Sequence, residues 1–236
     1  MIDLRGQIAV VTGGSRGIGR AIAQALADEG VSVAICGRDR VSLNSALRDL
    51  NAAGAAVGET CDVGSPEQAG EFFAFVDREL GGVDILVNNA GVGNFGAVDE
   101  LTPEAWDEVI ATNLSGPFYF SRLAAPRMRK RGGGFILNIG SLAGKYPFAG
   151  GAAYNASKFG LAGFTEAMML DLRYDNIRVS TIMPGSVQTG FRPGAINADW
   201  KLDPEAIASM AVHLIRTPDR NLASRVEMRP SRPSRR

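Results

Sequence analysis

The chain has 236 residues and no formal net charge; 45% of the residues are hydrophobic and 21% are charged. These values are those of an ordinary globular domain, and the balanced charge argues against nucleic acid or a membrane surface as a partner. The two cysteines, Cys36 and Cys61, are too few for a disulfide framework and predict buried thiols in a reducing compartment. We see no signal-peptide pattern and no apolar run of membrane-spanning length, and therefore expect a cytoplasmic protein.

Apolar runs that predict buried strands alternate with amphipathic stretches that predict helices. In chain order, the expected strands cover residues 8–12, 31–36, 55–60, 83–88, 135–140, 177–183 and 224–228. The expected helices cover about 17–29, 40–53, 66–80, 103–130, 152–174 and 204–216. This alternation is typical of the α/β class. We expect one Rossmann-type domain, with a doubly wound, mostly parallel, seven-stranded sheet and helices on both faces.

The domain is expected to span residues 1–228, because no linker, repeat or low-complexity segment interrupts residues 1–220. Within it, the segment at about 186–203 is rich in Gly, Pro and Asn and is expected to form a lid over the substrate. Residues 229–236, rich in Arg, Pro and Ser, are expected to be a solvated basic tail.

A glycine-rich turn lies between the first expected strand and the first expected helix. Gly13, Gly17 and Gly19 give it the spacing G-x-x-x-G-x-G. Glycine lets the backbone approach a pyrophosphate closely, and a helix N-terminus adds unpaired N–H groups and a favourable dipole. Because the turn follows the first strand of a βαβ unit, we interpret it as a dinucleotide site rather than a plain turn.

Tyr154 and Lys158 are four residues apart on an expected helix, so their side chains share one face. An ammonium beside a phenol favours phenolate and is expected to lower the tyrosine pKa from about 10 towards neutrality. Such a group suits general acid catalysis near neutral pH. Ser141 ends the fifth expected strand, just before this helix, so the three side chains are expected to converge.

Six motifs taken together resemble the short-chain dehydrogenase/reductase family, in the family's order over about residues 5–190. They are the glycine turn, Asn88-Asn89-Ala90-Gly91, Asn113, Ser141, the Tyr154/Lys158 pair and Pro184-Gly185. The resemblance implies an oxidoreductase in which a hydride passes between a nicotinamide and a carbonyl or carbinol carbon.

The resemblance also implies catalytic roles. Tyr154 would be the acid in reduction and the base in oxidation, and Lys158 would lower its pKa and bind the nicotinamide ribose. Ser141 would polarise the substrate oxygen. Asn113 would hold a water that links Lys158 to solvent.

Cofactor binding is implied for a larger set of residues. They are Gly13, Ser15, Arg16, Gly17, Ile18, Gly19, Arg38, Asp62, Val63, Asn89, Ala90, Gly91, Pro184, Gly185, Val187 and Thr189, with Tyr154 and Lys158. Arg38 follows the second strand, where NAD-binding relatives usually carry an acid, and Arg16 lies in the glycine turn. Two guanidinium groups suit the 2′-phosphate of NADP(H), which we therefore expect in preference to NAD(H). The alternative is that Asp39 binds the ribose and Arg38 is solvated.

The substrate site is less defined by the sequence. Its expected lining includes Asn94, Phe95, Leu142, Phe148, Ser186 and Phe191. These mostly bulky, apolar side chains favour a neutral or acyl-type carbonyl compound. Within the family the chain is similar to carbonyl reductases and to 3-oxoacyl-[acyl-carrier-protein] reductases. Lys130 and Arg131 match a basic patch that docks the carrier, but Asp175 stands where those reductases usually have Arg.

Three functions therefore stay open: a carbonyl reductase or alcohol dehydrogenase, a 3-oxoacyl-[acyl-carrier-protein] reductase, and a non-catalytic nucleotide-binding scaffold. The full set of catalytic candidates favours an enzyme. The sole histidine, His213, lies away from every motif, and no metal site is expected. Apolar residues on the expected helices at 103–130 and 152–174 predict a homodimer or homotetramer. They include Ala162, Phe164, Met168 and Met169.

Overall fold

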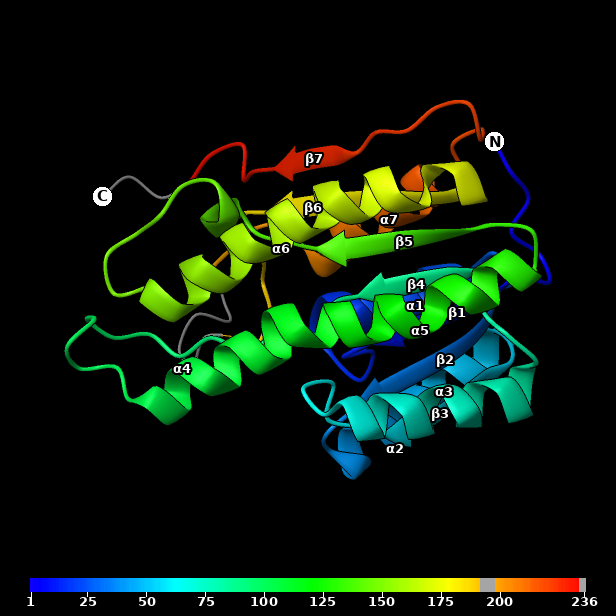
Figure 1. Cartoon of the computed structure of the whole chain (residues 1–236), viewed down its shortest axis with the longest axis horizontal. Helices are drawn as coiled ribbons and strands as arrows, with labels where there is room; N and C mark the ends of the chain where they lie inside the picture. The colour runs from blue at the N-terminus through cyan, green and yellow to red at the C-terminus, as the bar shows by residue number, and fades with distance from the viewer. Residues whose placement is uncertain (192–197, 234–236) are drawn as a thin grey trace.

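The computed structural model describes residues 1–191 and 198–233, and seven strands within them form one sheet. The strands are β1 (Ile8–Thr12), β2 (Ser32–Gly37), β3 (Ala56–Thr60), β4 (Ile85–Asn88), β5 (Gly134–Ile139), β6 (Ile177–Pro184) and β7 (Arg225–Met228). Their order is β3-β2-β1-β4-β5-β6-β7, and every neighbouring pair is parallel (Figure 1). The predicted fold class is confirmed, and the sheet is fully rather than mostly parallel.

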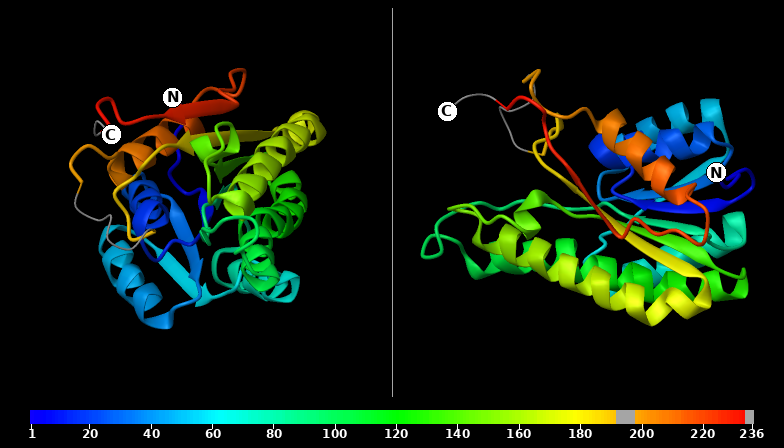
Figure 2. Two further views of the ribbon diagram at one scale, coloured as in Figure 1. Left: turned by 90° about the vertical axis from the view of Figure 1, so that its left-hand side faces the viewer. Right: turned by 90° about the horizontal axis from the view of Figure 1, so that it is seen from above.

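Helices cover both faces of this sheet. They are α1 (Gly17–Asp28), α2 (Arg40–Ala53), α3 (Pro66–Leu80), α4 (Pro103–Ile110), α5 (Gly116–Lys130), α6 (Ala152–Leu172) and α7 (Pro204–Ile215). Helices α1, α2 and α7 pack on one face, and α3, α5 and α6 pack on the other, as the right-hand view of Figure 2 shows. Apart from the helix expected at 103–130, the predicted elements agree with the structure to within two residues at each end.

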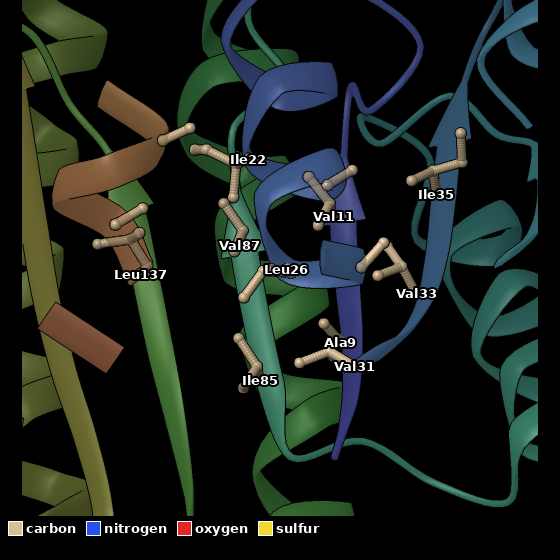
Figure 3. Close-up of a cluster of buried hydrophobic side chains, with 14 of the residues drawn as sticks. Ala9, Val11, Ile22, Leu26, Val31, Val33, Ile35, Ile85, Val87 and Leu137 are labelled. Atoms are coloured by element: carbon tan, nitrogen blue, oxygen red, sulfur yellow. The ribbon is translucent and has the colours of Figure 1, made fainter. Parts of the chain in front are cut away.

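The two helix layers each bury a separate hydrophobic core. Because successive strand residues point to opposite faces, Val11 of β1 joins the core under α1, while Val10 joins the core under α3 and α5. Figure 3 shows Ile22 and Leu26 of α1 facing the strands of the first core. Burying side chains of this size stabilises the fold by about 1.5–3 kcal/mol each. The two cores hold the strands in position, and the strands in turn determine where the loops at their carboxyl ends begin.

The helix expected over 103–130 is divided into α4 and α5 by a π turn at Ala111–Ser115. The Gly116 N–H donates to the Ala111 carbonyl, five residues back. Pro117 has no N–H, so it cannot donate to the Asn113 carbonyl four residues before it. The regular series of helical hydrogen bonds is therefore interrupted at the Asn113 carbonyl. Single π turns of this kind are frequent at functional sites.

No helix among residues 1–191 and 198–233 is long and apolar enough to cross a membrane. In Figure 1 the arrows of β4, β5 and β7 point to the same side of the molecule, and because every neighbouring pair is parallel, the other strands end on that side too. Parallel α/β sheets bind their ligands at this edge.

Candidate active site

A cleft of about 780 Å³ lies at the carboxyl ends of the strands. It is lined by the segments that follow β1 to β6. All residues predicted to bind the cofactor line this cleft except Gly19: Gly13, Ser15, Arg16, Gly17, Ile18, Arg38, Asp62, Val63, Asn89, Ala90, Gly91, Tyr154, Lys158, Pro184, Gly185, Val187 and Thr189.

The glycine turn is held against the loop after β4. Gly13 and Gly17 have backbone φ angles of 63° and 54°, which residues other than glycine rarely adopt. Gly19 has a packing role, because a Cβ atom there would overlap both the Gly13 carbonyl and the Asn89 amide. The Asn89 Nδ2 donates to the Thr12 carbonyl at 2.9 Å. The backbone of the turn is thus held in place by the close packing at Gly19 and by the hydrogen bond from Asn89.

Helix α1 begins without a side-chain cap, as α5, α6 and α7 do and unlike α2, α3 and α4. Asp39, Ser65 and Thr102 cap α2, α3 and α4 with side-chain oxygens. Arg16, the residue before α1, makes no such cap. No side-chain cap from Arg16 therefore occupies the first N–H groups of α1, and the helix dipole makes this end of the cleft favourable for an anion.

Three donor side chains gather where the cleft meets the loop after β2. Arg16, Arg38 and Ser42 line it there, together with Asp39. The Asp39 carboxylate accepts a 2.8 Å hydrogen bond from the Ser42 N–H, and hydrogen bonds from Ser42 are the main reason that its pKa is lowered. Arg38 forms an ion pair with Glu108 of α4 at 3.1 Å. The carboxylate of Asp39 is thus used as a helix cap, and the donors form a surface suited to a phosphate group.

At the other end of the cleft, Ser141, Tyr154 and Lys158 converge. Ser141 lies two residues beyond the end of β5, and its hydroxyl hydrogen-bonds the Tyr154 side chain. Lys158 is buried and its Nζ donates to the Ile139 carbonyl at 2.9 Å. The same Nζ lies 5.8 Å from the centroid of the Tyr154 ring. A hydroxyl, a phenol and an amine therefore share one end of the cleft, as the sequence predicted.

In this structure the pKa of Tyr154 lies above its ordinary value, contrary to the expected lowering towards neutrality. Burial raises the pKa of the Tyr154 phenol, and the hydrogen bond with Ser141 only partly opposes the rise. Burial also lowers the pKa of Lys158 to about 8. Both shifts have one cause, because a group removed from water favours its uncharged form. Tyr154 is therefore a neutral phenol at neutral pH, which is the protonation state of an acid.

Asn113 lies behind the cleft rather than in its lining. Its side chain is buried and is bound to the backbone of Val92, through a 2.8 Å bond from the Val92 N–H and a 2.9 Å bond to the Val92 carbonyl. Its Nδ2 also donates to the Ser157 hydroxyl. The side chain of Asn113 thus ties the π turn to the loop after β4 and to α6.

Aromatic side chains surround Tyr154 at the substrate end. The ring of Phe95 lies 5.6 Å from that of Tyr154 and 5.9 Å from that of Phe148, and Phe191 lies 5.8 Å from Tyr154. Of the six residues predicted for this lining, Ser186 and Phe191 line the cleft itself.

The other predicted substrate residues are placed differently. Asn94 donates through its amide to Glu108 at 3.0 Å, and Leu142 lies beside Gly185. Several lining residues were not predicted: Ser42, Cys61, Val92, Thr112, Ile139 and Gly140 among them. The sequence signal for Ser42 was its spacing of three from Asp39, an N-cap pattern, whereas Thr112 carried none.

The predicted lid at 186–203 is described only in part, because residues 192–197 lie outside the described ranges. Its two ends meet: Val187 bridges to Leu202, and the Leu202 N–H donates to the Ser186 carbonyl at 3.0 Å. Phe191 and Trp200, from either side of the gap, both line the cleft.

Comparison with known proteins agrees with this geometry. The family model for short chain dehydrogenases matches residues 7–199. A candidate ketoacyl reductase of Streptomyces coelicolor is 43% identical over 186 residues, which cover 78% of this chain and 71% of that protein. Among solved structures, a metagenomic short-chain oxidoreductase in complex with NADP is 39% identical, with a TM-score of 0.87, and the match covers 98% of this chain and 100% of that one.

A second solved structure, an actinorhodin polyketide ketoreductase variant with NADPH, is 34% identical with a TM-score of 0.89. That match covers 95% of this chain and 96% of the other. The motifs, the parallel sheet, the cleft and these similarities lead to one conclusion. The chain belongs to the short-chain dehydrogenase family and is an oxidoreductase that acts on CH–OH or carbonyl groups.

Proposed function

We propose that this protein is an NADP-dependent oxidoreductase that reduces a carbonyl compound to an alcohol, or catalyses the reverse reaction, with Tyr154 as the acid or base. One observation carries the proposal: Ser141, Tyr154 and Lys158 meet in a cleft whose other end is the glycine turn and a cluster of arginine and serine donors. A proton-transfer group and a dinucleotide site in one cleft are what hydride transfer to a carbonyl requires.

A bound nicotinamide cofactor would supply or accept the hydride. Tyr154 would donate its phenolic proton to the substrate oxygen, and the Ser141 hydroxyl would orient that oxygen by a hydrogen bond. Lys158 is protonated at pH 7, and its positive charge would stabilise the phenolate left by proton transfer. The carbonyl of Asn113 receives no bond from Pro117, and it would hold a water in a proton path to solvent.

The test of Tyr154 is its replacement by phenylalanine, which removes the proton and keeps the ring. Tyr154→Phe is expected to lower kcat at least about 1000-fold, because the acid is lost, while the Kd for NADPH changes little. Tyr146→Phe is the control, since Tyr146 is a half-exposed tyrosine outside the cleft lining. Undiminished turnover by Tyr154→Phe would rule out the mechanism, and NADPH binding without turnover of any carbonyl by the wild type would favour the scaffold.

The preference for NADP(H) rests on Arg16, Arg38 and Ser15, which line one end of the cleft. Because Asp39 caps α2, the alternative that Asp39 binds the ribose of NAD is weakened. Two of the similar solved structures contain NADP or NADPH. A kcat/KM ratio for NADPH over NADH at or below one would contradict this preference.

A 3-oxoacyl-[acyl-carrier-protein] reductase is the second candidate, and the similarity to ketoacyl reductases favours it. The basic patch at the end of α5 is less suited to an acidic carrier, because Arg129 pairs with Asp175 at 2.6 Å and Arg131 pairs with Asp84. Comparing a carrier-bound 3-oxoacyl thioester with the same acyl group on a small thiol decides between the two. A KM that is the same for both would argue against recognition of the carrier.

The assembly and location are also proposals. Phe118 of α5 and Phe159 and Leu170 of α6 are between 45% and 55% exposed, which supports pairing of these helices in a homodimer or homotetramer. Sedimentation velocity would test this.

Cys36 and Cys61 are both free and buried, which supports the reducing environment of a cytoplasm. Small molecules remain the expected substrates.

A further inference from the structure

Glu108 of α4 connects the two ends of the cleft. Its Oε1 accepts a hydrogen bond from Arg38 Nη1 at 3.1 Å, and its Oε2 accepts one from Asn94 Nδ2 at 3.0 Å. Arg38 follows β2 and lines the cleft at its phosphate-binding end. Asn94 directly precedes Phe95, whose ring contacts Tyr154. One carboxylate therefore binds the residue expected to recognise the cofactor and the loop beside the acid.

We propose that Glu108 is a specificity-determining residue that limits the preference for NADP over NAD, because its carboxylate competes with the 2′-phosphate for the guanidinium of Arg38. This inference rests on the proposed function. A 2′-hydroxyl has no charge and does not compete with a carboxylate in this way, so the effect is confined to the phosphorylated cofactor.

The exposure of the pair makes an exchange of partners feasible. The side chains of Arg38 and Glu108 are 54% and 43% exposed. Ion pairs this exposed are weak, whereas an Arg–phosphate pair is often bidentate and carries more charge. A phosphate can therefore take Arg38 from Glu108, but some binding free energy is lost in the exchange.

Glu108 also stays in place after the exchange. Hydrogen bonds from Asn94 and from Arg38 lower its pKa, so it is ionised at neutral pH. The bond to Asn94 holds the carboxylate near the cleft when Arg38 leaves, and a negative charge then faces a negatively charged phosphate. Both the competition and the repulsion weaken NADP binding and spare NAD.

Two substitutions separate the charge from the contact with the loop. Glu108→Gln removes the charge and keeps a carbonyl oxygen that can accept from Asn94, whereas Glu108→Ala removes both. Asp107→Asn is the matched control: it makes the same charge change one residue away, and Asp107 forms no ion pair with any described residue. Arg38→Ala and the double variant Arg38→Ala/Glu108→Gln test whether the effect passes through Arg38.

The measurement is the Kd of NADPH and of NADH for each protein, by isothermal titration calorimetry. Glu108→Gln is expected to tighten NADPH binding about two- to fivefold, the range set by a weak exposed ion pair, and to leave NADH unchanged. Asp107→Asn should change neither, and the gain should vanish in the Arg38→Ala background. Glu108→Ala should show the same gain for NADPH and, in addition, a raised KM for the carbonyl substrate.

Unchanged or weaker NADPH binding by Glu108→Gln would overturn the inference, as would an equal change for both cofactors or a gain that persists without Arg38. Circular dichroism would establish that each variant is folded. If the wild type binds and oxidises NADPH but Glu108→Gln has no effect, the inference fails alone. If the wild type does not bind NADPH, the proposed function fails as well.

Discussion

The two ends of the cleft are built from different parts of the chain. The nucleotide end is made by backbone: Gly13 and Gly17 have positive φ, and Gly19 leaves no room for a Cβ atom. The substrate end is made by side chains on loops, where Phe95 and Phe191 surround Tyr154. Backbone geometry of this kind restricts the sequence tightly, whereas loop side chains can be exchanged. We therefore expect the residues of the nucleotide end to be constrained by the shape of the cofactor, and those of the substrate end to be adapted to the substrate.

The largest expected effect tests the rigidity of the nucleotide end. Gly19→Ala places a Cβ atom on the Gly13 carbonyl and the Asn89 amide, so the turn must shift. We expect a loss of about 2–4 kcal/mol in the free energy of unfolding, and weaker NADPH binding.

Gly70→Ala in α3 is the control for this substitution, because a Cβ atom there meets nothing within 4 Å. It should stabilise the protein by about 0.5–1 kcal/mol through better helix propensity. Urea denaturation measures both variants. Wild-type stability and affinity in Gly19→Ala would show that the nucleotide end tolerates change as a loop does.

Lys158, at the catalytic end, is expected to reduce stability. Its pKa is lowered from 10.5 to about 8 by burial, so the unfolded chain binds the proton more tightly than the folded chain. The cost is full below pH 8 and falls as the pH rises from about 8 towards 10.5. Lys158→Met should therefore be more stable than the wild type by about 2 kcal/mol at pH 7, after allowing for the lost bond to Ile139, and the advantage should shrink towards pH 10.

Denaturation of the cofactor-free proteins at pH 7 and pH 9.5 checks this prediction. Lys130→Met, at the exposed end of α5, serves as the control and should show no such pH dependence. A Lys158→Met advantage that is constant with pH, or is absent at pH 7, would mean that Lys158 is not a strained group in the folded protein.

The substrate end should respond through catalysis rather than through cofactor binding. Phe95→Ala removes a ring that contacts Tyr154 and Phe148. We expect kcat/KM for a carbonyl substrate to fall about tenfold, corresponding to about 1.4 kcal/mol, with the Kd for NADPH unchanged. Val98→Ala is the control, since Val98 is an exposed residue three positions further along the chain. Equal effects on substrate and cofactor would mean that the two ends are not independent.

The same contrast explains which features could be predicted from the sequence. The strands, most helices and the glycine turn follow from local patterns, because apolar periodicity and glycine spacing act through the backbone. The break of the expected helix at 103–130 was missed although Pro117 signals it, because the apolar pattern continues on both sides. Pro117 thus indicated the break, but the continuous apolar pattern favoured a single helix.

Other misses had no local signal. Asn94 was predicted to line the substrate site, but it binds Glu108, a partner 14 residues away whose position depends on the packing of α4. The pKa of Tyr154 depends on how deeply the ring is buried, which spacing to Lys158 does not reveal. Directions of loop side chains and degrees of burial are tertiary properties, and the sequence pattern does not contain them.

The smallest expected effect compares two helix N-termini. Ser65 caps α3 by accepting a 3.2 Å hydrogen bond from the Gln68 N–H, so Ser65→Ala should cost about 1 kcal/mol in the free energy of unfolding and leave NADPH binding unchanged. Arg16 makes no cap at α1, so Arg16→Ala should cost less than about 0.5 kcal/mol in stability but weaken NADPH binding several-fold more than NADH binding.

Thermal denaturation and titration of both cofactors would measure these two variants side by side. The two effects should be separate, because one helix end uses its own side chain to satisfy its N–H groups and the other leaves them for a ligand. If Arg16→Ala destabilises the protein as much as Ser65→Ala does and leaves both cofactor affinities unchanged, then the N-terminus of α1 has no role in cofactor binding. The proposed anion site at the nucleotide end would then lose one of the observations that support it.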